Sequence, residues 1–136
     1  MANTRRRRVI RVGKYRSKFE HTLSKIIPKR FEYEPARFPY TYQAKSTYCP
    51  DWAYKNVWLE AKGYFRTYSE ARKYLCIREA YPDIVLLFVF ADPYKAMVGA
   101  RKKKDGTRQT MSDWADKNGF QWCTPETLLS KLKEIA

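Results

Sequence analysis

Helical spacing of apolar residues, together with residues that start or stop helices, predicts four helices. The first begins at Ser17, whose hydroxyl can cap it, and ends before Pro28. The second begins at Ser69 and ends before Pro82. The last begins at Thr124 and carries a clean apolar stripe. The four predicted helices cover residues 17–27, 69–80, 111–118 and 124–135.

Between these helices, three segments have the pattern of β-strands. Residues 31–34 (FEYE) alternate between apolar and polar side chains. Residues 84–91 (IVLLFVFA) are apolar on both faces, as central strands covered by helices are. The segment 57–63 (VWLEAKG) alternates, with Val57, Leu59 and Ala61 on one face and Trp58, Glu60 and Lys62 on the other. This order of elements predicts an α/β fold with a small mixed β-sheet flanked by helices.

The composition is that of one folded domain. The chain has 136 residues, of which 44% are hydrophobic and 16% aromatic. Its longest apolar run, 84–91, is too short to cross a membrane, and the N-terminus lacks the apolar stretch of a secretory signal. Cys49, Cys76 and Cys123 form no CxxC pair, which predicts free thiols in a reducing cytosol rather than disulfides or a zinc site.

Positive charge is concentrated in two segments. Lys and Arg number 28 against 14 acidic residues, which gives a net charge of +14. Residues 1–30 carry 11 basic side chains and one acid, and a second basic block spans 101–108. Because Lys and Arg attract phosphates, nucleic acid is favoured as the partner over an anionic membrane or a merely basic surface. The candidate DNA contacts are Arg5, Arg6, Arg7, Arg8, Arg11, Lys14, Arg16, Arg101, Lys102, Lys103 and Lys104.

One group of charged residues carries candidate chemistry. Glu60 and Lys62 project from the same face of the predicted strand, and a hairpin would bring Asp51 beside Glu60. Converging carboxylates repel each other unless a cation sits between them, and hard oxygen ligands suit Mg²⁺ or Mn²⁺. A nearby lysine can orient water or offset charge on a phosphate. Together with the basic surface, this pattern favours a metal-dependent nuclease.

Structural explanations compete for several of these residues. A Glu-x-Lys pair on an exposed edge strand is common and needs no function. Glu20 lies on the rim of the buried face of the first helix, from where it can lean over the edge of a sheet. It also forms a capping-box pattern with Ser17, in which the glutamate closes back onto the backbone. Four tyrosines could stack on bases or pack across strands, namely Tyr33, Tyr40, Tyr42 and Tyr48.

The motifs resemble those of a known group of enzymes. Pro50-Asp51, eight further residues and Glu60-Ala61-Lys62 form a compact version of the PD-(D/E)xK nuclease signature. Beyond that signature, the chain resembles the phage endonuclease I family of Holliday-junction resolvases, which implies a restriction-endonuclease-like core. The blocks that carry the resemblance, in the family's order, are YRSKFE (15–20), FEYE (31–34), TYCPDW (47–52), LEAKG (59–63) and IREAYPD (77–83).

The resemblance implies a domain-swapped homodimer with an active site shared between subunits. Asp51, Glu60 and Lys62 would come from one subunit and Glu20 from the other. Asp51, Glu60 and the backbone carbonyl of Ala61 would bind Mg²⁺ or Mn²⁺, and Glu20 would complete the metal site. The catalytic residues would be Glu20, Asp51, Glu60 and Lys62.

The same resemblance implies the domain organisation and the activity. Residues 17–136 would be a single nuclease domain, in which 35–48 is an extended bridge between the swapped parts; the basic residues and weak periodicity of 1–16 themselves predict a flexible arm. The enzyme would make paired nicks across four-way and other branched DNA junctions in the cytoplasm of an infected bacterium. Two other functions stay open: a sequence-specific nuclease of the restriction or homing type, and a non-catalytic junction-binding protein.

Overall fold

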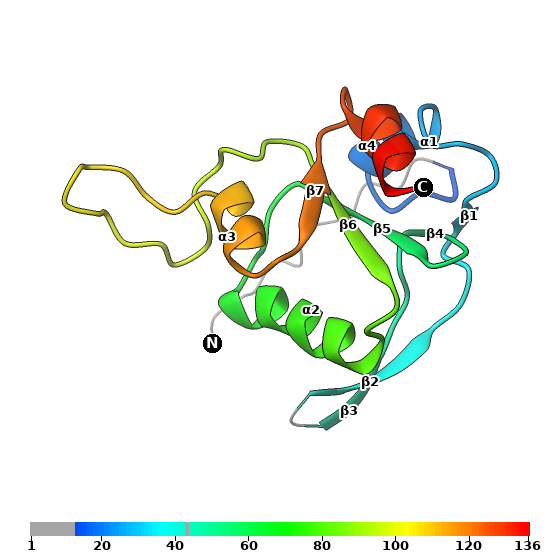
Figure 1. The fold of residues 1–136 in the computed structure, drawn as a ribbon, viewed down its shortest axis with the longest axis horizontal. Helices are drawn as coiled ribbons and strands as arrows, with labels where there is room; N and C mark the ends of the chain where they lie inside the picture. The colour runs from blue at the N-terminus through cyan, green and yellow to red at the C-terminus, as the bar shows by residue number, and fades with distance from the viewer. Residues whose placement is uncertain (1–12, 43) are drawn as a thin grey trace, which may run out of the picture.

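The computed structural model describes residues 13–42 and 44–136 of the chain. Within these residues the chain forms four helices and seven strands (Figure 1). The helices are α1 (Lys18–Ser24), α2 (Tyr68–Ala80), α3 (Met111–Lys117) and α4 (Leu128–Ile135). The strands are β1 (Glu32–Tyr33), β2 (Phe38–Tyr42), β3 (Ala44–Tyr48), β4 (Trp52–Tyr54), β5 (Val57–Lys62), β6 (Val85–Phe90) and β7 (Gln121–Cys123). The predicted α/β class is confirmed.

Five of the strands form one mixed sheet, in the order β1-β4-β5-β6-β7. β4 pairs antiparallel with β1 and β5, whereas β6 pairs parallel with β5 and β7. Parallel neighbours need a crossover connection, and α2 and α3 lie in the two crossovers. The predicted mixed sheet is therefore confirmed, and β5 is its central strand.

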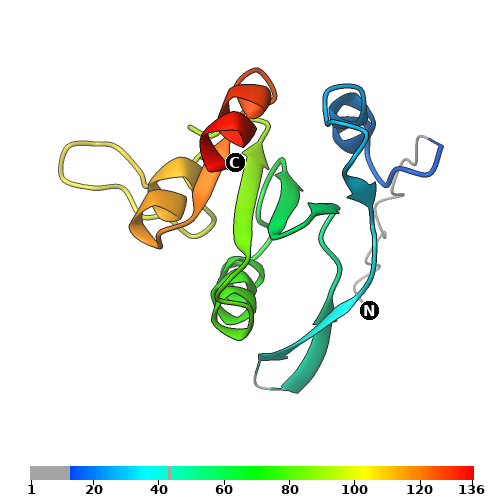
Figure 2. The ribbon, with the colours of Figure 1, turned by 45° about the vertical axis from the view of Figure 1, so that its right-hand side comes forward.

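Helices cover both faces of this sheet, so the core has two halves (Figures 1 and 2). On one face, α2 and α3 contribute to a buried cluster that includes Tyr74, Ile77, Phe88 and Trp114. On the other face, α1 and α4 contribute to a cluster that includes Leu23, Leu59, Leu128 and Leu132. β6 supplies side chains to both clusters, as its continuous apolar pattern predicts. No helix among the described residues is long and apolar enough to cross a membrane.

A tight hairpin joins β4 to β5. Tyr54 pairs with Val57, so only Lys55 and Asn56 lie in the turn. Lys55 has a φ of 51°, the left-handed conformation that two-residue turns of twisted hairpins use. The register runs back through Trp52, which pairs with Leu59. The hairpin that the sequence predicts between residues 51 and 60 is thus present.

Residues 35–48, which the family resemblance assigns as a bridge between subunits, contain a second hairpin. β2 and β3 form a separate two-stranded antiparallel sheet, which lies beside α2 in Figure 2. The Phe38 ring stacks on Trp58 with 4.6 Å between centroids, and the Tyr81 hydroxyl donates to the carbonyl of Pro39 at 2.5 Å. The hairpin therefore docks on the body of its own chain. Its role as a bridge between subunits stays a prediction.

Two predicted helix starts are wrong by a few residues. The cap of α2 is Thr67 rather than Ser69, because the Thr67 hydroxyl accepts from the backbone N–H of Glu70, the third residue of the helix. Residues 124–127 form a turn, so that α4 begins at Leu128. In that turn, the hydroxyl of Thr127 accepts from the backbone N–H of Thr124 at 2.9 Å, which satisfies a donor that a helix would leave free.

The two-sided burial of β6 predicts a large effect of truncation at its centre. Phe88 has no exposed surface and packs edge-on against Tyr74 and Phe120. We expect Phe88→Ala to lower the free energy of unfolding by about 3–5 kcal/mol in urea titrations, because it removes buried contacts and leaves a cavity. Tyr94→Ala is the control, since Tyr94 is 75% exposed and should cost less than about 0.5 kcal/mol. Equal losses in both variants would contradict this core assignment.

Candidate active site

The strand β5 carries Glu60 and Lys62 at its C-terminal end, on the face that α2 covers. Trp58, two residues before Glu60, packs in the cluster under α2, whereas Leu59 packs in the opposite cluster. The predicted alternation of faces is therefore confirmed. Glu60 is only 7% exposed and β5 is the central strand. The alternative of an exposed Glu-x-Lys pair on an edge strand is therefore wrong.

Asp51 lies directly before β4, where the hairpin register continued by one residue places it across from Glu60. One carboxylate oxygen, Oδ2, accepts from the backbone N–H of Ala61 at 2.9 Å. Burial raises the pKa of Asp51 well above its usual value, and the negative charges of Glu60 and Glu20 raise it further. The two predicted acids thus lie together, in a setting that disfavours ionisation of Asp51.

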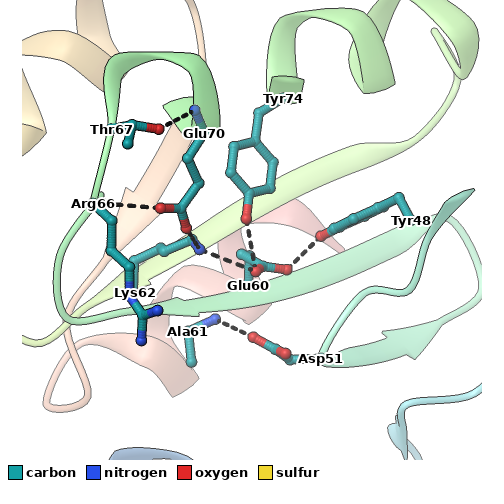
Figure 3. A network of polar contacts seen from close by, with 9 residues as sticks. All are labelled: Tyr48, Asp51, Glu60, Ala61, Lys62, Arg66, Thr67, Glu70 and Tyr74. Carbon is teal, nitrogen blue, oxygen red and sulfur yellow. Dashed lines mark hydrogen bonds and ion pairs between the residues drawn. The ribbon is translucent and has the colours of Figure 1, made fainter. Parts of the chain in front are cut away.

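Two tyrosine hydroxyls hold the Glu60 carboxylate (Figure 3). Tyr74 of α2 donates to Oε1 at 2.8 Å, and Tyr48, at the end of β3, donates to Oε2 through a short hydrogen bond. Both tyrosines are buried, and burial followed by the charge of Glu60 raises the pKa of each well above its usual value. They therefore remain hydrogen-bond donors over the whole working pH range of a protein. The carboxylate is fixed from two sides by two different elements.

The ammonium group of Lys62 lies between two carboxylates. Its Nζ is 2.7 Å from Oε1 of Glu70 and 3.7 Å from Oε1 of Glu60. Burial by itself lowers the pKa of Lys62, but the negative charges of Glu60 and Glu70 outweigh this effect and leave the pKa above its usual value. Lys62 therefore remains protonated at neutral pH and supplies a fixed positive charge at the site.

Glu70 connects Lys62 to the start of α2. Its backbone N–H donates to the capping hydroxyl of Thr67 at 3.1 Å, and its Oε2 accepts from the backbone N–H of Arg66 at 2.9 Å. Burial raises the pKa of Glu70, but the hydrogen bond and charge of Lys62 lower it below its usual value overall. Glu70 is thus an ionised partner whose position is set by the helix N-terminus.

Glu20 reaches the same region from α1. Ser17 caps the helix by accepting from the backbone N–H of Glu20 at 3.0 Å, which is half of the predicted capping box. The Glu20 side chain is engaged differently, since Oε1 accepts from the Tyr33 hydroxyl at 2.5 Å. Glu20 is 8% exposed, and its charge raises the pKa of Asp51 in the same chain. A single chain therefore brings Glu20 toward the acid pair, and exchange of α1 between subunits stays a prediction.

The predicted DNA-contact residues divide into three groups. Arg5, Arg6, Arg7, Arg8 and Arg11 lie outside the described residues. Lys14 and Arg16 are exposed, and the Arg16 guanidinium pairs with Glu34 at 2.8 Å, close to Tyr33. The second basic block is an exposed loop that projects beyond α3 in Figure 1 and carries Arg101, Lys102, Lys103 and Lys104.

The donor atoms at the acid pair suit a hard divalent cation. Asp51 and Glu60 offer carboxylate oxygens, and Ala61 between Glu60 and Lys62 adds a backbone carbonyl. The raised pKa of Asp51 shows that burial and neighbouring negative charge are incompletely offset there. Within the part of the chain that the structure describes, no three acidic, His or Cys side chains form a ready-made metal cluster. The two carboxylates and the backbone carbonyl are donors that suit an ion such as Mg²⁺, which keeps several waters and takes few protein ligands.

Comparison with known proteins gives the family of the chain. The family described as phage endonuclease I matches residues 1–135. This chain belongs to the phage endonuclease I family. The resemblance seen in the sequence motifs is confirmed by that match.

Two curated relatives support membership of the phage endonuclease I family. Endonuclease I of Escherichia phage T7 is 29% identical over 117 residues, which cover 82% of this chain and 74% of that protein. Endodeoxyribonuclease 1 of Enterobacteria phage T3 is 26% identical over 125 residues, which cover 88% of this chain and 78% of that protein. Both alignments span most of each chain, so the likeness is not confined to one motif.

Three residues of the site were not identified from the sequence. The sequence leaves base stacking and strand packing open for Tyr48, and no catalytic motif singles out Tyr74 or Glu70. The pattern Thr67-x-x-Glu70 is a helix-start signature, which indicates Thr67 as the cap of α2 and places Glu70 in its first turn. The hydrogen bonds of the two tyrosines depend on how β3 and α2 pack, which no local pattern encodes.

The raised pKa of Asp51 predicts how stability depends on pH in chelator-treated protein. A carboxyl group whose pKa is higher in the folded than in the unfolded state stabilises the fold below its unfolded pKa of about 4. That contribution is lost as the pH rises through the folded pKa. We therefore expect Asp51→Asn to raise the free energy of unfolding at pH 7 by on the order of 1 kcal/mol, and to flatten the pH dependence.

Thermal unfolding followed by circular dichroism between pH 4 and 8, in the presence of chelator, measures both effects. Asp83→Asn provides the control, because Asp83 is exposed and far from the acid pair in sequence. If Asp51→Asn instead lowers the free energy of unfolding at neutral pH, the charged form of Asp51 does not destabilise the fold.

Proposed function

We propose that this member of the phage endonuclease I family is a Mg²⁺-dependent, structure-selective DNA endonuclease that resolves four-way and other branched junctions. The observation that carries the proposal is that Asp51, Glu60 and Lys62 lie together at the C-terminal end of the central strand β5. The names of the two phage relatives, an endonuclease and an endodeoxyribonuclease, support DNA as the substrate. The excess of basic residues supports it independently, because a net charge of +14 favours binding to phosphates.

The residues of the site divide the chemistry among them. Asp51, Glu60 and the Ala61 carbonyl would hold the metal, with Glu20 completing the site. A bound Mg²⁺ or Mn²⁺ would lower the pKa of an attacking water and neutralise charge on the phosphate. Lys62 supplies a positive charge next to these acids, where it can orient the water or offset negative charge as the phosphodiester bond breaks.

The surrounding charges favour approach of the DNA backbone. Lys14 and Arg16 are exposed near the Tyr33–Glu20 pair, and the loop 101–108 offers a second basic surface. We propose that both surfaces contact phosphates, together with the arginines of residues 5–11. Such contacts position a duplex without reading its sequence, which agrees with selection by DNA shape.

Two sites acting on one junction require two subunits. We propose a homodimer in which each subunit cuts one strand, acting in the cytoplasm of the infected bacterium. A sequence-specific nuclease of the restriction or homing type is the alternative within this reaction class. A junction-binding protein without activity is the alternative outside it.

The acid pair predicts a separation of cutting from binding. We expect the wild-type protein to nick a synthetic four-way junction in Mg²⁺ much faster than a linear duplex of the same sequence. Asp51→Asn and Glu60→Gln should lower the cleavage rate by about a hundredfold or more, since each removes a charged group from the reacting site. Both variants should keep their junction affinity in gel-shift titrations with chelator.

The control variant for this experiment is Glu79→Gln, which alters an exposed acid on α2 away from the site. Equal cutting of junction and duplex would refute structure selectivity. Binding without cutting by the wild-type protein in Mg²⁺ and Mn²⁺ would leave only the non-catalytic alternative.

The origin of Glu20 at each site can be tested by mixing two inactive variants. If Glu20 comes from the partner subunit, a heterodimer of Glu20→Gln and Asp51→Asn subunits contains one intact site. We then expect refolding of the mixture to restore nicking of a junction to about a quarter of the wild-type rate. This value assumes that subunits assemble at random into dimers. Half of the dimers are then mixed, and one of the two sites in each mixed dimer is intact.

If Glu20 acts within its own chain, no heterodimer has an intact site and the mixture stays inactive. Refolded wild-type protein shows the recovery that the procedure allows. A monomeric mass in light scattering, together with full activity, would refute both the dimer and the shared site.

A further inference from the structure

The helix α2 presents two polar side chains, one turn apart, to the two charged side chains of β5. Tyr74 donates to Oε1 of Glu60 at 2.8 Å, and Glu70 accepts from Nζ of Lys62 at 2.7 Å (Figure 3). Four residues along a helix span about 6 Å, and two residues along a strand span about 7 Å. The spacing of the helical pair therefore matches the spacing of the strand pair, so that each helical side chain meets one partner.

Both helical side chains are themselves fixed. The ring of Tyr74 is fully buried and packs edge-on against Phe88 with 4.9 Å between centroids. Glu70 uses its second oxygen to accept from the backbone N–H of Arg66 at 2.9 Å, next to the Thr67 cap. Their orientation is thus set by core packing and by the helix start before any substrate arrives.

Packing alone does not account for this choice of residues. A buried hydroxyl and a partly buried carboxylate are costly unless they are hydrogen-bonded, so apolar residues would join α2 to the sheet more simply. The two polar groups instead make their contacts with charged side chains of the site. Tyr48 of β3 donates a second hydroxyl hydrogen bond to Glu60. The Lys62 ammonium donates its hydrogen bond to Glu70.

We propose that Tyr74 and Glu70 are positioning residues for the cleavage reaction. Tyr74 holds the Glu60 carboxylate in the orientation in which it binds metal, and Glu70 holds the Lys62 ammonium against the acid pair. The proposal rests on the proposed function, because it assigns to α2 the task of keeping that function's metal ligand and cation in place. The two residues have separate tasks: Tyr74 positions a metal ligand, and Glu70 positions the ammonium group that faces the phosphate.

The test compares Tyr74→Phe, Glu70→Ala and Glu70→Gln with two controls from the same helix, Tyr68→Phe and Glu79→Gln, which alter exposed side chains. Mn²⁺ binding to DNA-free protein is measured by electron paramagnetic resonance, and single-turnover nicking of a four-way junction is measured at saturating Mg²⁺. Tyr74→Phe should weaken Mn²⁺ binding and slow nicking by about 10–100-fold, the usual effect of losing a group that orients a metal ligand.

Glu70→Ala should slow nicking by a similar factor but leave Mn²⁺ affinity unchanged. Glu70→Gln should recover part of that loss, because the amide oxygen can still accept from Lys62. Junction affinity in chelator should be the same for all variants. Circular dichroism checks that each variant is folded, and if Tyr74→Phe is not, the two partly exposed Glu70 variants decide the outcome.

The outcomes distinguish this proposal from the proposed function. Wild-type cutting together with Tyr74 and Glu70 variants that behave like the controls would overturn the positioning roles and leave the nuclease function standing. Wild-type protein that neither binds Mn²⁺ nor cuts would overturn the nuclease function itself. Parallel loss of stability and activity in Glu70→Ala, without recovery in Glu70→Gln, would show that Glu70 only supports the fold.

Discussion

Asp51 and Glu60 are two acids held across from each other in a site that water reaches only partly, and the surrounding groups offset the repulsion between their charged forms. The backbone N–H of Ala61 satisfies one oxygen of Asp51, two tyrosine hydroxyls satisfy Glu60, and the Lys62 ammonium lies beside it. These groups offset the repulsion incompletely, because the pKa of Asp51 remains raised. A site that is short of positive charge is stabilised when a cation binds, so the electrostatic cost of the acid pair and the proposed metal binding would have the same physical origin.

The sheet order determines which elements can supply those offsetting groups. Because β5 and β6 are parallel, the chain must cross over between them, and the crossover places α2 directly over the end of β5. The antiparallel hairpin on the other side of β5 delivers Asp51. The central strand therefore receives one partner from a hairpin and others from a helix. This mixed pairing lets short sequence segments converge on one carboxylate from both sides of the strand.

Local patterns predict the parts of this arrangement that depend on neighbouring residues. Alternation gives the two faces of β5, and continuous apolar character gives the burial of β6. The cap of α2 was misplaced because Thr67 and Ser69 are both capable hydroxyl residues, and only the position of Glu70 distinguishes them. The contacts of Tyr48 and Tyr74 were missed for a different reason. They join segments 12 and 14 residues from Glu60, and their geometry arises from packing between separate elements. The second role of Glu20, as the acceptor of the Tyr33 hydroxyl, likewise requires the position of β1.

The two-residue turn at Lys55 and Asn56 has a consequence for how this gene family can change over evolutionary time. Asp51 faces Glu60 because eight residues separate them and the hairpin between them is closed as tightly as it can be. Inserting one residue into either strand would rotate every side chain beyond it to the opposite face, and Asp51 would point away from Glu60. Descendants of this sequence can therefore lengthen the hairpin in steps of two residues, or absorb a single insertion in a bulge or a larger turn. The number of residues between these acids is therefore constrained by strand pairing, because any change in it must either keep the pairing of the two strands or be absorbed outside that pairing.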